Sequence, residues 1–171
     1  MTPTPVIRAK EEGERLWFYG GGDFRVKATA EETGGSLFIF EDYMTQGKMT
    51  PLHLHPDEEE AIYLIEGELL VQVDGANHRV TSGGLCVVPR GVAHAFLVIS
   101  DTARALVATS PGRTEAFFRG ASEPVAALHG AAGTVDFAKL QQSAAHNGGI
   151  EILGPPPFDM SSDAVSAATG A

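Results

Sequence analysis

The sequence predicts an all-β domain built from short antiparallel strands. Between residues 14 and 110, segments rich in Val, Ile, Leu, Phe and Tyr recur at about the 8–12-residue spacing that is typical of a β-sandwich or β-barrel. Gly-Gly, Asp-Gly and Pro-Arg-Gly breaks separate these segments. No stretch of useful length in this region has the apolar period of a helix.

The expected strands follow one another with short breaks. In order they are RLWFY (15–19), FRVKATA (24–30), SLFIFEDYM (36–44), PLHLH (51–55), EAIYLIEG (60–67), ELLVQVDG (68–75), HRVT (78–81), LCVVP (85–89), AHAFLVIS (93–100) and RALVATS (104–110).

The composition changes after the last of these strands. RTEAFFRGA (113–121) is compatible with a short helix or with a strand end packing over the barrel, and the segment 133–149 predicts a helix that starts near Asp136 and stops at Asn-Gly-Gly. Residues 150–158 predict an extended arm, and the small, polar last dozen residues predict disorder. The expected organisation is N-terminal strands and an arm (1–35), a barrel (36–111), a C-terminal helix and arm that pack on the barrel (112–158) and a tail (159–171).

Length and charge narrow the class of protein. A chain of 171 residues fits one domain with tails. Its 22 acidic and 12 basic residues give a net charge of −10, with no basic cluster, which argues against nucleic-acid and anionic-membrane partners. The N-terminus lacks the apolar core of a signal peptide, so we expect a cytoplasmic protein. The single cysteine, Cys86, excludes an intrachain disulfide and is expected to be a small buried hydrophobe.

Three histidines and a glutamate form the candidate site. His53 and His55 lie two positions apart, so on one strand both imidazoles face the same way. Glu60 begins the next expected strand, and His94 lies in a later one after a Pro-Arg-Gly turn. A His-x-His pair alone is compatible both with a metal site and with ordinary strand histidines, and the three consecutive glutamates 58–60 leave the carboxylate ligand open.

Such a set suits one divalent transition metal. Imidazole nitrogens of intermediate softness and one carboxylate can hold Mn, Fe, Co, Ni, Cu or Zn, so the donor set does not choose the ion. Four protein ligands leave one or two positions for water, O2 or substrate, as a catalytic site requires.

These residues resemble the two motifs of the cupin superfamily. The first motif has Gly, His-x-His, Glu and Gly at fixed spacing, matched here by Gly47, His53, His55, Glu60 and Gly67. The second has Gly, Pro-x-Gly, His and Asn, matched by Gly83, Pro89, Gly91 and His94, with Val98 in place of Asn.

The resemblance implies a double-stranded β-helix, the jelly-roll barrel of cupins, with His53, His55, Glu60 and His94 as metal ligands. The spacing to Gly67 selects Glu60, which leaves Asp57, Glu58 and Glu59 as a solvated loop and strand start. His78, His129 and His146 match no ligand position and are expected at the surface. Cupins usually form homodimers through N-terminal strands, for which residues 15–22 and 24–30 are the candidates.

The segment PGRTEAFFRG after the barrel resembles quercetin 2,3-dioxygenase-like cupins. The resemblance implies a metal-dependent dioxygenase that cleaves a flavonol-like or other aromatic or enolic small molecule with O2, with Glu60 also acting as the catalytic base. Strand parity predicts an apolar pocket wall, with the alternative that these side chains are barrel core. The expected wall residues are Met49, Ile62, Leu64, Phe96 and Val98, joined by Phe38 or Phe40. Two other functions stay open: a non-redox metal-dependent cyclase, isomerase or lyase of an aromatic or polyketide-like metabolite, and a non-catalytic ligand-binding cupin.

Overall fold

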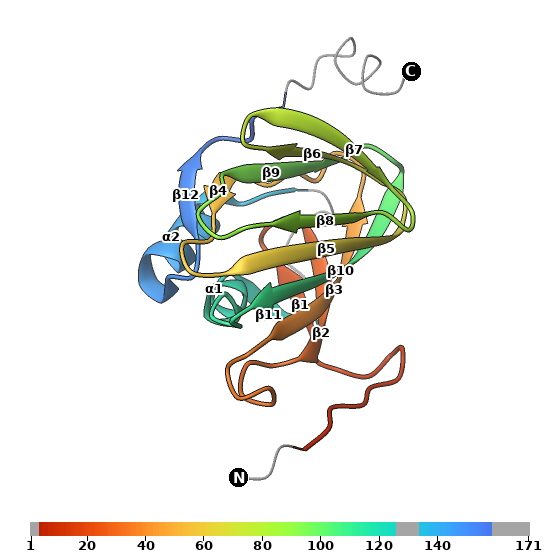
Figure 1. Ribbon diagram of the computed structural model, residues 1–171, viewed down its shortest axis with the longest axis vertical. Coiled ribbons are helices and arrows are strands. Elements are labelled where there is room, and N and C mark those ends of the chain that lie inside the picture. Colours follow the sequence, from red (N-terminus) through yellow and green to blue (C-terminus); the bar gives the residue numbers. More distant parts are fainter. Residues whose placement is uncertain (1–3, 126–133, 159–171) are drawn as a thin grey trace.

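A computed structural model describes residues 4–125 and 134–158 and contains two facing antiparallel sheets (Figure 1). The all-β expectation is confirmed. The seven-stranded sheet has the order β11 (Ser122–Pro124), β1 (Arg15–Phe18), β2 (Gly22–Ala28), β3 (Phe38–Thr45), β10 (Thr102–Ser110), β5 (Glu59–Glu66) and β8 (Leu85–Val88). The five-stranded sheet has the order β12 (Glu151–Gly154), β4 (Leu52–Leu54), β9 (His94–Val98), β6 (Glu68–Val73) and β7 (Ala76–Thr81).

Alternating burial decides which side chains enter the barrel. In β5 the even-numbered residues from Glu60 to Leu64 are buried, whereas Tyr63 between them is exposed. The core between the sheets is rich in aromatic side chains. Phe40 of β3 packs against Phe24 of β2, with ring centroids 5.1 Å apart. The two sheets therefore enclose one apolar interior that also receives Glu60.

The turn at Gly67 passes the chain from one sheet to the other, between β5 and β6. Its φ is +90°, and a Cβ at this position would lie 2.4 Å from the carbonyl oxygen of Thr102. Only glycine fits such a backbone conformation and so close an approach. This explains in physical terms why the motif has glycine at the end of the glutamate-bearing strand.

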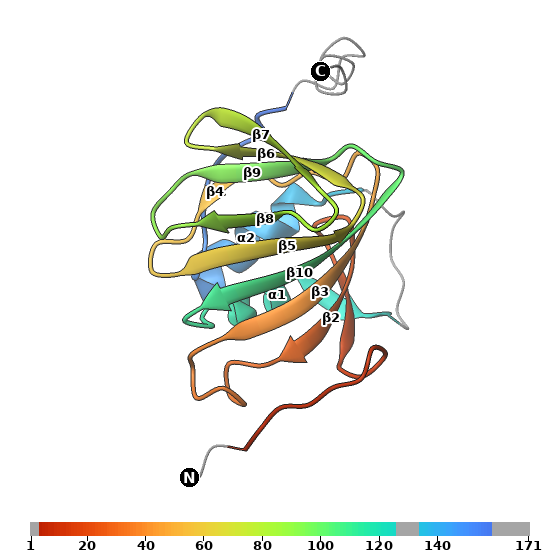
Figure 2. The same cartoon turned by 45° about the vertical axis from the view of Figure 1, so that its right-hand side comes forward.

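The C-terminal segment covers one side of the barrel. The segment left open as helix or strand is a helix, α1 (Glu115–Gly120), followed by the short strand β11, which the sequence did not predict. The predicted second helix is α2 (Phe137–Asn147), whose N-cap Asp136 accepts a hydrogen bond from the Lys139 N–H at 3.1 Å. The extended arm is strand β12, paired with β4 (Figure 1). Figure 2 shows both helices behind β5 and β10.

Two expectations concern residues that the structure does not describe. The predicted disordered tail, 159–171, and His129 lie outside the described residues. Within the described ranges, no helix has the length and apolar character needed to span a membrane.

Candidate metal centre

The structure brings the four expected ligand residues together inside the barrel. His53, His55, Glu60 and His94 are all buried, and each offers a nitrogen or carboxylate oxygen within 4.8 Å of those of the others. His53 belongs to β4, His94 to β9 and Glu60 to β5, so the group joins the two sheets. The imidazole rings of His53 and His94 are the closest pair of the three, with centroids 4.2 Å apart.

Strand register accounts for this convergence. His53 and His94 are direct partners across the antiparallel pair of β4 and β9. His55 follows β4, where its carbonyl oxygen accepts a hydrogen bond of 2.7 Å from the N–H of Gly91 in the turn before His94. This bond ties the His-x-His segment to the Pro-Arg-Gly turn, so the two motifs hold each other in place.

Two of the histidines are neutral in this environment. The Nδ1–H of His53 donates to the carbonyl oxygen of Pro51 at 2.8 Å, which leaves its Nε2 lone pair free for a metal. Burial, together with the neighbouring His94 and His55, lowers the pKa of His53 to about 3. Burial also lowers the pKa of His55. Both imidazoles therefore present unprotonated nitrogens at neutral pH.

His94 and Glu60 form the charged part of the group. The Nε2–H of His94 donates to Oε2 of Glu60 at 3.0 Å, and its Nδ1–H donates to the carbonyl oxygen of Val92 at 3.0 Å. Burial opposes the charged form of His94, but the hydrogen bond and charge of Glu60 outweigh it and raise the pKa of His94. Burial would raise the pKa of Glu60, but His55 and then His94 outweigh it and lower that pKa to about 2.

The group fits a divalent metal ion. Within the described residues, Nε2 of His55 is buried without a hydrogen-bond partner, 3.7 Å from Oε2 of Glu60. A buried nitrogen acceptor left in this state is unfavourable unless something else satisfies it. An ion among the three imidazoles and Glu60 would do so, would replace the proton shared by His94 and Glu60, and would meet the donor set that first-row metals accept.

Glu58 corrects the expectation of a solvated acidic loop. Its side chain is 1% exposed and accepts hydrogen bonds from the backbone N–H groups of Arg113 and Thr114, before α1. One of its oxygens lies 4.0 Å from Nδ1 of His55. Glu59 does face solvent, where it pairs with Arg90. Glu58 is buried because its hydrogen bonds hold the chain before α1 against the loop that carries His55.

A cavity of about 50 Å³ adjoins the group and is lined by His53 and Glu60. Of the expected wall residues, four line it: Phe40, Met49, Ile62 and Phe96. The other three, Phe38, Leu64 and Val98, are fully buried in the core and do not line it. His78 and His146 are exposed. Cys86 is half-buried at the edge of the core, and burial raises the pKa of its thiol.

Several wall residues were missed from the sequence. The C-terminal segment supplies Phe117, Phe118, Leu140, Ile150 and Ile152. Their apolar character was visible and their segment was expected to pack on the barrel, but nothing in the sequence indicated that these side chains line the cavity. Asp42 and Lys48 also line the cavity. Strand parity with Phe38 and Phe40 could have drawn attention to Asp42, whereas Lys48 lies in a turn and gave no signal.

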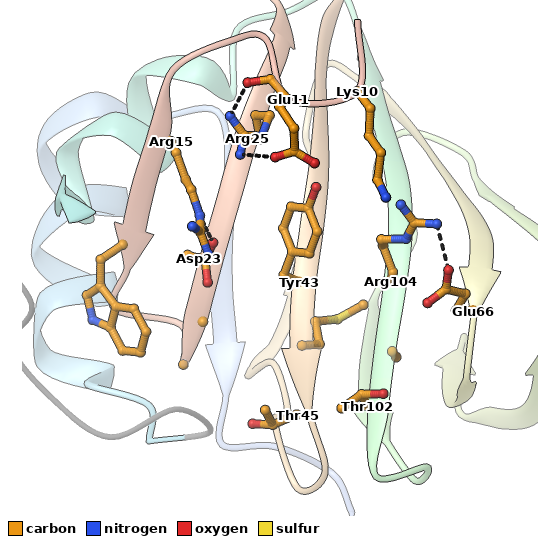
Figure 3. A pocket seen from close by; sticks show the side chains of 15 residues that line it. Lys10, Glu11, Arg15, Asp23, Arg25, Tyr43, Thr45, Glu66, Thr102 and Arg104 are labelled. Atoms are coloured by element: carbon orange, nitrogen blue, oxygen red, sulfur yellow. Dashed lines mark hydrogen bonds and ion pairs between the residues drawn. The ribbon is translucent and has the colours of Figure 1, made fainter. Parts of the chain in front are cut away.

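A larger hollow of about 490 Å³ lies on the other face of β1, β2, β3 and β10 (Figure 3). It shares no lining residue with the cavity beside the histidines. Its arginines are paired with carboxylates, Arg15 with Asp23, Arg25 with Glu11 and Arg104 with Glu66. The strands expected to form a dimer contact border this hollow, and a homodimer through them stays a prediction.

The structure is a β-barrel with a buried group of three histidines and one carboxylate that fits a metal ion. Residues 40–109 match the family model described as the cupin domain, so the chain carries a cupin domain. A solved structure of an RmlC-like cupin from Shewanella frigidimarina superposes with a TM-score of 0.58 at 23% identity, covering 67% of this chain and 98% of that one. At this identity the likeness establishes the fold.

Two curated relatives are similar in sequence. Quercetin 2,3-dioxygenase of Bacillus subtilis is 30% identical over 108 residues, which are 63% of this chain and 32% of that protein. Polyketide synthase CurC of Streptomyces cyaneus is 32% identical over 82 residues, which are 47% of this chain and 53% of that protein. The chain thus spans about a third and about half of the length of these relatives.

Proposed function

We propose that this protein is a metal-dependent dioxygenase acting on an aromatic or enolic small molecule, in the manner of quercetin-cleaving enzymes. The observation that carries the proposal is the buried group of three histidines and Glu60 at the wall of an aromatic cavity. The similarity to a quercetin 2,3-dioxygenase over 108 residues supports the same reaction class.

His53, His55, His94 and Glu60 would hold the ion. When bound, a divalent metal supplies Lewis acidity toward an enolic oxygen and, if redox-active, a route for electrons toward O2. The neutral imidazoles of His53 and His55 need lose no proton to bind it. The apolar walls contributed by Phe40, Ile62 and Phe96 exclude water from the reacting centre.

Glu60 would act as the base at Oε2. The low pKa of this carboxyl keeps it ionised at neutral pH, as an acceptor must be. The same low pKa makes Glu60 a weak base, which suits an acidic enolic hydroxyl better than an aliphatic alcohol. Oε2 already accepts a hydrogen bond from Nε2–H of His94, so this oxygen is placed as an acceptor.

The cavity must widen to admit a flavonol. About 50 Å³ is well below the roughly 300–1,000 Å³ of pockets that hold drug-sized ligands. Part of the cavity wall consists of side chains from α1, α2 and β12, here called the cover. The two helices pack on the barrel, and β12 is the edge strand of the five-stranded sheet. Outward movement of this cover would open the site, and its return would exclude water around the substrate.

A Glu60→Gln variant tests the proposed role of the base. Removing a general base typically costs about 100-fold to 10,000-fold in rate, so oxygen uptake with flavonols should fall by about that factor. Elemental analysis should still find metal, because the three histidines remain. Glu59→Gln, the same change on an exposed neighbour, is the matched control and should keep full activity. Full oxygen uptake by Glu60→Gln would overturn the assignment.

The similarity to a polyketide synthase protein favours a second candidate, a non-redox cyclase, isomerase or lyase that uses the same four ligands. Oxygen consumption in step with substrate loss distinguishes the two. Conversion of an aromatic substrate without oxygen uptake would support the non-redox reaction and contradict the dioxygenase.

A further inference from the structure

A buried ion pair lies in the wall of the same cavity. Nζ of Lys48 is 2.8 Å from each carboxylate oxygen of Asp42, and the Lys48 side chain is 1% exposed. Asp42 belongs to β3, and Lys48 lies in the turn that follows. Both residues line the cavity that His53 and Glu60 also line.

The ion pair lies at an inward position where an apolar side chain would be expected. Asp42 faces inward between Phe40 and Met44, on a strand whose other inward residues are apolar. Replacing a buried ion pair by apolar residues of similar volume is often neutral or stabilising, so stability alone does not account for the pair. The ammonium has three N–H donors, and the contacts found within the described residues are the two bonds to Asp42 and the Phe18 ring 5.9 Å away.

The ion pair and the group of three histidines and Glu60 lie at different levels along the strands. Across β3, β10 and β5, Phe38 is level with Glu60 through Thr109. Asp42 lies four residues further along β3, which is an offset of roughly 13 Å along the strand at the rise of antiparallel β-structure. Apolar cavity residues lie between the two levels, namely Phe40, Val107 and Ile62. The cavity wall is therefore polar at two separated places and apolar between them.

We propose that Asp42 and Lys48 form a subsite for a second hydroxyl group of the substrate, remote from the oxygen that the metal would bind. This inference rests on the proposed function. A hydroxyl can donate to Asp42 and accept from Lys48 at the same time. A carboxylate would meet the negative charge of Asp42, so the pair selects a neutral phenol. The substrate class is thus an aromatic enol that carries a further phenolic hydroxyl at its far end.

Flavonol binding to the zinc-loaded full chain tests the subsite without turnover, because zinc is not redox-active. The probes are 3-hydroxyflavone, which has only the enolic hydroxyl, and quercetin, which has further hydroxyls on its outer rings. The native chain should bind quercetin about tenfold more tightly or better, which is the contribution of about one buried hydrogen bond. In Lys48→Met this preference should disappear while the affinity for 3-hydroxyflavone stays within about twofold.

Controls separate recognition from stability. Lys139→Met, an exposed lysine of α2, should keep the preference for quercetin. If Lys48→Met does not fold because Asp42 is left unpaired, the double variant Asp42→Asn/Lys48→Met removes both charges and gives the same readout.

A retained preference in either variant, or an equal loss of affinity for both flavonols, would overturn the subsite. Equal affinities in the native chain would also overturn it, while leaving the dioxygenase proposal intact. Selective binding by the zinc-loaded chain, together with no oxygen uptake by the chain loaded with a redox-active metal, would contradict only the dioxygenase.

Discussion

Glu58 and Glu60 have the same side chain, lie on the same side of their segment, and serve different purposes. Glu60 meets two imidazoles, whereas Glu58 meets backbone N–H groups of the chain that leads into α1. Burial raises the pKa of Glu58, and hydrogen bonds from Thr114 and Arg113 oppose that shift. What decides each role is the partner, and the partner of Glu58 lies more than fifty residues away in the sequence.

Glu58→Ala should therefore destabilise the protein far more than Glu59→Ala. The first change leaves the N–H groups of Arg113 and Thr114 without their acceptor, at a cost of about 2–4 kcal/mol. The second removes an exposed ion pair with Arg90, worth about 0–1 kcal/mol. Urea unfolding of the two variants and the native chain measures both costs. Equal losses would mean that Glu58 does not secure the C-terminal segment.

At the scale of elements, the barrel strands, α2 and the C-terminal arm could be predicted, whereas β11 and the individual contacts of the cover with the barrel could not. Alternating apolar residues and glycine-rich breaks are local signals, so the sequence placed the ten strands from β1 to β10 within a few residues. The cover depends on long-range contacts, such as the pairing of Ile152 with His53. The same distinction applies to the site: motif spacing gathered the four ligand residues, whereas Asp42, Lys48 and Phe118 were missed.

Phe118 is the cover residue that we expect to limit the size of the ligand. Phe118 lines the cavity, and its ring centroid lies 4.6 Å from that of Phe40 and 5.2 Å from that of Phe18. Phe118→Ala should enlarge the cavity and raise the affinity for quercetin relative to a one-ring enol about tenfold, at a cost in stability of about 2–4 kcal/mol. Ligand titration and thermal unfolding measure the two effects. Phe137→Ala, the same change at an exposed position of α2, should alter neither. Unchanged selectivity in Phe118→Ala would show that another side chain sets the limit.

At the scale of the whole molecule, the ligand group is a contact between the two sheets. His53 and His94 come from the five-stranded sheet and Glu60 comes from the seven-stranded sheet. Without an ion, the direct polar link from these histidines to Glu60 is the bond between His94 and Glu60, and Nε2 of His55 is unsatisfied. A bound ion would connect all four side chains, so its binding energy would stabilise the barrel as a whole.

Metal binding should therefore raise the unfolding temperature of the entire chain. An ion at about a thousand times its dissociation constant stabilises the native state by about 4 kcal/mol. For a domain of this size each kcal/mol corresponds to about 2–4 °C, so zinc should raise the unfolding temperature over that of EDTA-treated protein by roughly 10 °C. In His94→Ala most of this shift should vanish, because the ion loses a ligand from one sheet. His78→Ala, which removes an exposed histidine of β7, should keep the full shift. A shift of equal size in His94→Ala and His78→Ala would place the ion elsewhere on the protein.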